Sequence, residues 1–362
     1  MKIGTIVGAR PQFIKAAMIS KELKRHNQEE VIIHTGQHYD YNMSKVFFEE
    51  LDIPTPHYNL GISGGSHGRM TGEMLIQLEN VLMQEKPDIV LVYGDTNSTM
   101  AGALAAVKLH MPVCHVEAGV RLGTLNNPEE VNRIVTDNVS SLLLCCTESA
   151  VNSLKAEGKK TSIELVGDPM FDAFKYYSTK VCTKQPEVLT SLIDGAKIAS
   201  IPSQYNYITC HRQENTNDDD CLLQILRAVN SLPEVAIYPV HPRNNSRALR
   251  LVRKFEWNNE LLCEPVGYLM SVYLTLNCNK IVTDSGGLQR EAFFAGKQCV
   301  TVFDHVSWPE TMVGKRNQLA QADCEDILNK LNEKQVISKD SLPFGDGTAS
   351  CKIVKAIENY FE

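Results

Sequence analysis

The chain has 362 residues, of which 43% are hydrophobic and 22% are charged, and its formal net charge at pH 7 is −7. At about 150 residues per domain this length suggests two domains, each able to bury a core without disulfides or metals. The acidic balance argues against a protein that coats nucleic acid, although a few basic residues would suffice to bind a small anion.

Possible targeting segments and the spacing of the cysteines further limit the kinds of protein to which the chain can belong. No apolar stretch reaches the roughly 18 residues that a membrane-spanning helix needs, and the N-terminal segment resembles a strand more than a secretory signal. The 11 cysteines include no Cys-x-x-Cys pair, which favours buried thiols in a reducing compartment over a zinc site. We expect a cytoplasmic protein that binds neither metal, membrane nor nucleic acid.

Short apolar runs alternate with amphipathic helical patterns in the first half of the chain. The helical patterns include Pro11–His26 and Asn97–His110. The predicted strands are Ile3–Gly8, Val31–Thr35, Ile89–Gly94, Val113–Ala118, Leu142–Thr147 and Ile163–Gly167. This alternation is typical of a parallel sheet covered by helices on both faces.

A second series of the same kind follows, with helical patterns at Cys221–Leu232 and Cys324–Asn332. Its predicted strands are Tyr205–Cys210, Val235–Val240, Leu261–Pro265, Lys280–Thr283 and Cys299–Phe303. Two series predict two doubly wound α/β domains. We place them at residues 1–168 and 169–348, and expect a final helix in residues 349–362 to pack back on the first domain.

Polar residues follow the predicted strands of the first half, at the edge where open parallel sheets bind ligands. Arg10 and Lys15 follow the first strand and predict an anion site at a helix start. Asp95 follows the third strand and would also serve as a helix cap. Glu117 ends the fourth strand, where a buried carboxylate must be paired or have a shifted pKa. Glu129 opens the next helix, where the helix dipole alone would favour an acid.

The second half repeats this arrangement. His211 and His241 each follow a strand and are each followed closely by an arginine. Ser285, Gly286 and Gly287 then join a strand to a helix and would offer backbone N–H groups to a phosphate, while Glu291 lies one turn further on. These features predict a cleft between two domains, with a nucleotide diphosphate on one wall and several carboxylates for proton transfer on the other.

In combination, these stretches resemble the non-hydrolysing UDP-N-acetylglucosamine 2-epimerase family. The matching segments run through almost the whole chain and are Gly8–Lys15, Thr35–His38, Gly94–Thr99, His115–Arg121, Pro128–Arg133, His211–Asn215 and Asp284–Glu291. The segment from Gly61 to Gly68 further resembles a subgroup that acts on UDP-2,3-diacetamido-2,3-dideoxyglucuronate. The resemblance implies a GT-B-like pair of Rossmann domains with the active site in the interdomain cleft, a homodimer, and no metal or redox cofactor.

The resemblance also implies a reaction, the reversible inversion of C2 of a UDP-2-acetamido sugar in surface polysaccharide synthesis. UDP leaves C1 as a base removes the C2 proton, which gives a 2-acetamidoglycal, and UDP then adds back. By motif position, proton handling belongs to Asp95, Glu117 and Glu129, and His211 assists the departure of UDP. The implied UDP-sugar contacts are Arg10, Lys15, Arg133, His241, Ser285, Gly286, Gly287 and Glu291.

The chain departs from the family pattern at several positions. Phe303, Ser307 and Trp308 stand where the family commonly has other residues, Trp308 in place of a basic one near the nucleotide. Asp137-Asn138 replaces the usual Asp-His or Asp-Arg pair. Three alternatives therefore stay open: a hydrolysing epimerase that releases UDP and N-acetylmannosamine, a GT-B glycosyltransferase, and a UDP-sugar-binding homologue without catalysis. The substituents at C3 and C6 of the sugar and allosteric activation by substrate are also open.

Overall fold

The computed structural model describes residues 1–362 except 37–47, 49, 184–186, 199 and 337–341. The chain divides into two compact units, Met1–Lys175 with Leu342–Glu362, and Tyr176–Ser341. The last helix therefore belongs to the first unit. The domain borders at residues 168 and 348 stay a prediction.

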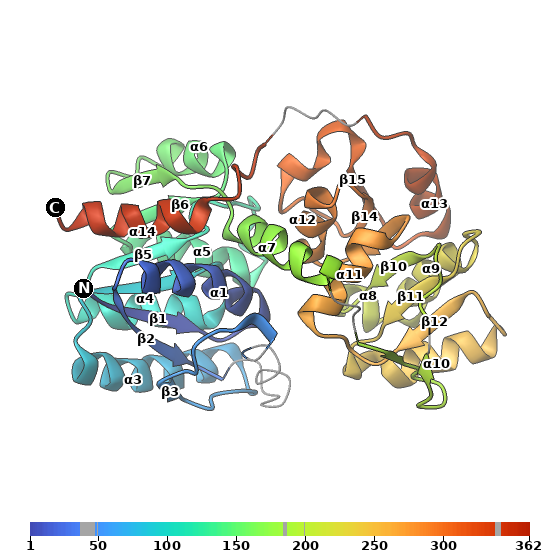
Figure 1. Ribbon diagram of the computed structural model, residues 1–362, viewed down its shortest axis with the longest axis horizontal. Helices are drawn as coiled ribbons and strands as arrows, with labels where there is room; N and C mark the ends of the chain where they lie inside the picture. The colour runs from blue at the N-terminus through green and yellow to red at the C-terminus, as the bar shows by residue number, and fades with distance from the viewer. Residues whose placement is uncertain (37–47, 49, 184–186, 199, 337–341) are drawn as a thin grey trace. The chain divides into compact units, whose positions relative to one another are not determined.

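The first unit is built around a seven-stranded parallel sheet with the order β3-β2-β1-β4-β5-β6-β7 (Figure 1). Its strands are β1 (Lys2–Val7), β2 (Glu29–His34), β3 (Tyr58–Asn59), β4 (Ile89–Tyr93), β5 (Val113–Val116), β6 (Leu142–Cys145) and β7 (Ser162–Leu165). Its helices are α1 (Arg10–Arg25), α3 (His67–Glu85), α4 (Asn97–Lys108), α5 (Pro128–Val139), α6 (Glu148–Ala156) and α14 (Ala349–Tyr360), and α7 (Pro169–Thr183) runs across the division between the units.

The core of the first unit forms because its central strands, such as β4 and β6, are apolar and buried on both faces. Ile6, Ile33 and Val92 of the sheet pack with Met74 and Leu78 of α3 in one buried cluster. Elsewhere in the unit, α14 packs on α1, and the two are drawn close together in Figure 1. Burying the sheet on both faces is what the continuous apolar runs predict.

The second unit contains a six-stranded parallel sheet with the order β12-β11-β10-β13-β14-β15. Its strands are β10 (Asn206–Thr209), β11 (Ala236–Pro239), β12 (Glu260–Cys263), β13 (Lys280–Thr283), β14 (Gln298–Val302) and β15 (Asn317–Ala320). A small antiparallel pair is formed by β8 (Leu189–Thr190) and β9 (Lys197–Ile198). The helical segments are α8 (Gln213–Thr216), α9 (Asp219–Asn230), η1 (Pro242–Asn244), α10 (Asn245–Lys254), α11 (Tyr268–Asn277), α12 (Gly286–Phe294), η2 (Pro309–Lys315) and α13 (Cys324–Asn332).

These two sheets confirm the predicted fold class of two doubly wound α/β domains. In each sheet the strand order reverses beside one central strand, β1 in the first unit and β10 in the second. Loops leave such a switch point in opposite directions and open a crevice at the carboxyl ends of the strands. The predicted site residues that follow β1, β4, β10 and β13 therefore lie at the two switch points.

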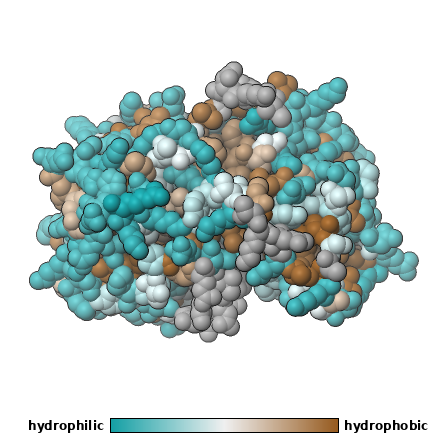
Figure 2. Space-filling model, in the orientation of Figure 1, coloured by the Kyte–Doolittle hydropathy of each residue, from teal (hydrophilic) through white to brown (hydrophobic). Residues whose placement is uncertain are grey.

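The surface agrees with the charged composition. The face in Figure 2 is mainly hydrophilic, with smaller apolar areas. Large exposed apolar side chains come from separate elements, such as Ile76 on α3 and Leu125 before α5. Among the described residues, no helix has both the length and the apolar character that crossing a membrane would require.

Candidate functional site

The turn after β1 is joined to the turn after β4 by one side chain. Gln12 accepts hydrogen bonds from the N–H groups of Gly8 (2.7 Å) and Ala9 (3.0 Å), and its amide donates to the carbonyl of Tyr93 (2.8 Å). A Cβ on Gly8 would lie 2.2 Å from the hydroxyl oxygens of both Ser98 and Thr35, so only glycine fits this turn. Because Gln12 takes the N–H groups of Gly8 and Ala9, these two groups are not offered to an anion.

Lys15, on the buried side of α1, forms an ion pair with the carboxylate of Glu117 after β5. Both side chains are almost fully buried, at 3% and 6% exposure, so the pair excludes most solvent. Glu117 has a left-handed φ of 73°, which is costly for a residue with a Cβ. The sequence predicted a carboxylate that is either paired or shifted in pKa at this strand end, and in the structure Lys15 pairs with it.

Asp95, after β4, is held by the guanidinium of Arg133 on α5, which also contacts Glu130 at 3.0 Å. Burial opposes a charge on Arg133, but the nearby carboxylates of Asp95, Glu130 and Glu117 raise its pKa above the ordinary value. Arg133 therefore connects electrostatically the two carboxylates, Asp95 and Glu117, that the sequence assigned to proton transfer.

The adjacent acids of α5 lie in different surroundings. The side chain of Glu129 is exposed, whereas Glu130 is buried. Glu130 accepts hydrogen bonds from the N–H groups of Leu122 (2.7 Å) and Gly123 (3.2 Å) and thereby shapes the loop that follows β5. Sequence reasoning singled out Glu129 and overlooked Glu130, whose role in the structure is to hold this loop and Arg133.

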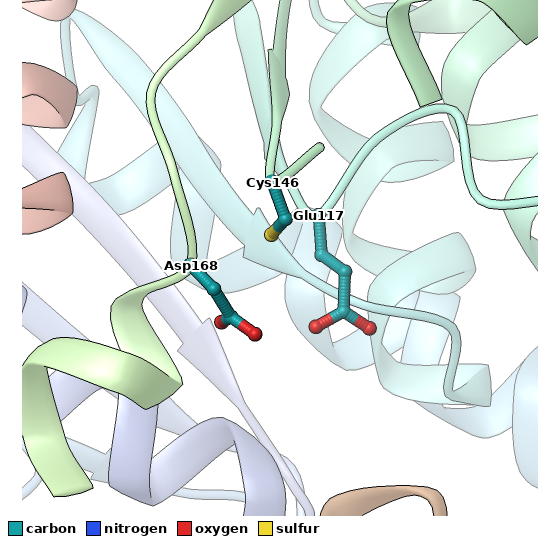
Figure 3. Close-up of side chains that lie close together, drawn as sticks. All are labelled: Glu117, Cys146 and Asp168. Carbon is teal, nitrogen blue, oxygen red and sulfur yellow. The ribbon is translucent and has the colours of Figure 1, made fainter. Parts of the chain in front are cut away.

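A carboxylate, a thiol and a second carboxylate come together after β5, β6 and β7. Ligand atoms of Glu117, Cys146 and Asp168 lie within 4.8 Å of one another (Figure 3), a spacing that could suit a metal ion. Glu117 is already paired with Lys15. Asp168 accepts a 2.8 Å hydrogen bond from the N–H of Met170 at the start of α7. These contacts account for the two carboxylates structurally, and we assign no ion to the group.

In the second unit, one buried carboxylate organises the switch point. Asp284, directly after β13, accepts hydrogen bonds from the N–H groups of His211 (2.9 Å) and Arg212 (2.8 Å), and its Oδ1 lies 3.1 Å from Nδ1 of His211. Burial alone would raise the pKa of Asp284, but the His211 ring and these N–H groups lower it to about 2. Asp284 thus orients the His211 ring, whose side chain is 43% exposed.

His241 lies beside His211, with stacked rings and centroids 6.5 Å apart. Burial, the charge of Arg243 and the neighbouring His211 ring lower the pKa of His241 below its ordinary value. Arg243 donates a hydrogen bond to the carbonyl oxygen of His211. The two histidines that the sequence paired by pattern are therefore neighbours.

Ser285 is the N-cap of α12, and its hydroxyl accepts from the N–H of Leu288 at 3.4 Å. Gly286 and Gly287 form the first turn of this helix, where N–H groups lack helical partners. A Cβ on Gly286 would lie 3.6 Å from Nε1 of Trp308, which places the indole beside the turn. Arg290 stacks on the Trp308 ring at 4.0 Å from its centroid.

The structure thus assembles the predicted residues as two groups, one in each unit. Lys15, Glu117, Asp95 and Arg133 form the first, with Arg10 as the first residue of α1. His211, His241 and the turn at Ser285 belong to the second unit, where Glu291 is buried on α12. Gln37 and His38, which the sequence analysis included, lie outside the described residues.

Three comparisons with known proteins agree on one family. Residues 21–358 match the profile of the family described as UDP-N-acetylglucosamine 2-epimerase. The chain is 47% identical to a UDP-N-acetylglucosamine 2-epimerase homolog of Methanococcus maripaludis, over 99% of this chain and 100% of the relative. It is 45% identical to the UDP-2,3-diacetamido-2,3-dideoxy-D-glucuronate 2-epimerase of Pseudomonas aeruginosa, over 98% and 99% of the two chains.

Solved structures give the same result. The crystal structure of Methanocaldococcus jannaschii UDP-GlcNAc 2-epimerase in complex with UDP-GlcNAc and UDP matches with a TM-score of 0.88 and 38% identity, over 99% of this chain and 100% of that one. The structure of the Neisseria meningitidis UDP-GlcNAc 2-epimerase bound to UDP-GlcNAc matches with a TM-score of 0.87 and 30% identity, over 99% and 100% of the chains.

Proposed function

The chain belongs to the UDP-N-acetylglucosamine 2-epimerase family, and from this premise we propose that it inverts C2 of a UDP-2-acetamido sugar without hydrolysing it. The observation that carries the proposal is the first group of charges, in which Glu117 is paired with Lys15 and Asp95 with Arg133. Two buried or partly buried carboxylates, each beside a cation, are suited to take up and return one proton.

The reaction proceeds by elimination and re-addition. A carboxylate of the first unit takes the proton from C2, the C1–O bond to the diphosphate breaks, and a C1=C2 double bond forms. A second group, which carries its proton when the substrate binds, gives that proton to the opposite face of C2 as a diphosphate oxygen of UDP re-forms the bond to C1. Proton exchange with solvent then returns both groups to their starting states. Atoms and charges balance, and no oxidant or reductant is consumed. We assign the proton transfers to Glu117, Asp95 and Glu129.

The second unit supplies the groups that bind and release UDP. The N-terminal turn of α12 at Ser285–Gly287 would hold a phosphate, because N–H groups and the helix dipole favour an anion there. Glu291 would accept hydrogen bonds from the ribose hydroxyls. His211, oriented by Asp284, would stabilise the charge that develops on the departing diphosphate. Four further residues complete the proposed UDP-sugar contacts: Arg10, Lys15, Arg133 and His241.

Incubation in D₂O with NMR detection tests the proposal. UDP-N-acetylglucosamine and its 2,3-diacetamido-glucuronate analogue are supplied separately, because relatives of both kinds match the chain. Deuterium at C2 together with a manno-configured UDP-sugar would establish epimerisation and select the substrate. Free sugar with UDP would indicate the hydrolysing reaction instead. Binding without exchange of either compound would contradict the proposal.

The family resemblance also implies a homodimer, and we propose this state for the protein in solution. Sedimentation at twice the mass of one chain supports it, and sedimentation as a monomer contradicts it. Neither result bears on the proton-transfer chemistry, because the carboxylates and cations of the first group all come from one chain.

A further inference from the structure

A fully buried histidine and aspartate lie directly behind the turns that carry Asp95 and Glu117. His115 on β5 and Asp137 on α5 have no exposed side-chain surface. Nδ1 of His115 lies 2.6 Å from Oδ1 of Asp137, and Nε2 lies 2.7 Å from the carbonyl oxygen of Gly94. The other oxygen of Asp137 accepts from the N–H of Gly119 at 3.1 Å and from the guanidinium of Arg121 at 2.7 Å.

The hydrogen-bond partners define the protonation state of the pair. A carbonyl oxygen only accepts, so Nε2 of His115 must carry a hydrogen. Burial would raise the pKa of Asp137, but His115 and Arg121 lower it, so the carboxyl group is ionised. An ionised carboxylate also only accepts, and Nδ1 of His115 must therefore carry a hydrogen as well. The geometry requires an imidazolium ring that donates in two directions at once.

The two hydrogen bonds that His115 donates connect it to the turn that carries Asp95 and, through Asp137, to the turn that carries Glu117. Gly94 is followed directly by Asp95, and a Cβ on Gly94 would lie 3.7 Å from Oε1 of Glu117 and 3.5 Å from Nζ of Lys15. A shift of the Gly94 carbonyl would therefore move the turn beside both carboxylates. On the other side, Asp137 holds the N–H of Gly119, two residues after Glu117.

The backbone conformation at Glu117 has to be held in place by hydrogen bonds such as the one between Asp137 and Gly119. The left-handed φ of 73° at Glu117 is strained for a residue other than glycine and persists only where the surroundings enforce it. The N–H groups of Glu117 and Ala118 both donate to the carbonyl oxygen of Leu144, at 3.0 and 3.1 Å. The bond from Gly119 to Asp137 then secures the far end of the same turn.

We propose that His115 and Asp137 are positioning residues, which hold the Asp95 turn and the Glu117 turn in one fixed arrangement for the two proton transfers. The pair touches neither substrate nor the transferred proton in this proposal and acts through the two turns. The catalytic part of the proposal rests on the proposed epimerase function. Sub-ångström placement of an acid or base is worth up to about 100-fold in rate.

The test compares Asp137→Asn with a matched variant, Asp172→Asn. Asp172 is also a buried carboxylate of the first unit, and it accepts from the N–H groups of Ala349 (3.0 Å) and Ser350 (2.6 Å) at the start of α14. Asp137→Asn is expected to lower kcat by about 30- to 100-fold while the KM stays within about threefold. Asp172→Asn should lower the thermal midpoint yet leave kcat per UDP-binding site within about twofold.

A second variant and two spectroscopic readouts keep the test independent of folding yield. His115→Gln retains one donor for Gly94 but loses the link to Asp137, and it should lower kcat in the same way. In the wild-type enzyme, ¹⁵N NMR should show a hydrogen on each ring nitrogen of His115, as its two acceptor contacts require. The ¹³C carboxyl signals of Asp95 and Glu117 should shift in Asp137→Asn and stay in place in Asp172→Asn.

Several results would overturn the proposal. The first is a neutral His115 ring in the wild-type protein. The second is that the ¹³C carboxyl signals of Asp95 and Glu117 do not shift in Asp137→Asn. The third is a loss of kcat in Asp137→Asn that is no larger than the loss in Asp172→Asn. An inactive wild-type enzyme would instead overturn the proposed function, and the ¹³C signals would still decide whether the pair fixes the two turns.

Discussion

The two switch points differ in how they balance charge. In the first unit, two of the three carboxylates assigned to proton transfer have a cationic partner within the same unit: Lys15 with Glu117, and Arg133 with Asp95. In the second unit, the central carboxylate, Asp284, is buried under backbone N–H groups, and the neighbouring His211 side chain is partly exposed. Both sheets have the same parallel architecture, yet one edge neutralises its own charges and the other presents basic and N–H groups to solvent.

This difference in charge pairing suits the first unit to proton transfer and the second unit to anion binding. A carboxylate held by a cation in a buried or partly buried position is placed to exchange a proton with a substrate bound against it. Exposed histidine and helix N–H groups attract an anion and lose little when it departs. If this division is correct, substitutions in the first unit should affect turnover, and substitutions in the second should affect the handling of UDP.

The largest effect is expected from Glu117→Gln. The amide keeps the shape of the side chain but cannot accept the C2 proton, so turnover should fall by about 10³-fold or more. UDP affinity should stay within a few-fold, since Glu117 is not among the residues proposed to contact UDP. Deuterium incorporation at C2 measures the first quantity and calorimetric titration with UDP the second. A variant with wild-type turnover would remove Glu117 from proton transfer.

The substitution His211→Asn tests whether His211 acts in the departure of UDP or only in the binding of UDP. His211 is assigned to the departure of UDP, so kcat should fall by about 100-fold. The dissociation constant of UDP should change much less, because the α12 turn still holds the phosphates. Steady-state kinetics and UDP titration of the same preparation separate these quantities. Equal losses in kcat and in UDP affinity would make His211 a binding residue only.

A smaller effect is expected from Glu291→Gln, which tests binding in the second unit. Hydrogen bonds from ribose hydroxyls to a carboxylate are worth more than those to a neutral amide, so UDP affinity should fall by about tenfold. The saturated turnover rate should be nearly unchanged. Comparing UDP with free diphosphate in the titration provides the control, because diphosphate lacks the ribose and should bind both proteins equally.

The smallest effect concerns Glu260, a buried carboxyl group of β12 that has no hydrogen-bond partner among the described residues. Burial raises its pKa from 4.5 to about 7. The folded state therefore binds the proton more tightly than the unfolded state, and the stabilisation present below pH 4.5 is lost as pH rises through 7.

Glu260→Gln should consequently stabilise the protein at pH 8, by about 1 kcal/mol after allowance for solvent screening. The gain should vanish below about pH 5, where both states of the wild-type carboxyl are neutral. Urea unfolding at the two pH values measures it. A variant that is less stable than the wild type at pH 8 would show that the carboxyl group has a partner of its own in solution.

Much of the fold was predictable because buried parallel strands are continuous apolar runs. The predicted strand Lys280–Thr283 coincides with β13. The two-residue strands β3, β8 and β9 are too short to produce a pattern. Strand β15, Asn317–Ala320, was missed because polar Asn317 and Gln318 interrupt the apolar run.

The site was predictable where a charged residue interrupts an apolar strand end. That signal found Glu117, and the same reasoning applied to Asp284 and to His115 would have found both. Partners could not be predicted, because Lys15 precedes Glu117 by 102 positions and sheet topology alone brings them together. The choice between Glu129 and Glu130 also needed coordinates, since both occupy the first turn of one helix.

The position of α14 has a consequence for synthesis on the ribosome. The helix packs on α1, and its first N–H groups are capped by Asp172, yet the whole of the second unit separates it from the rest of the first along the chain. During translation the second unit can close as soon as it emerges, whereas the first is incomplete until α14 has been made. The half that is made first is thus completed last, and until then the surface of α1 that α14 covers is available to chaperones.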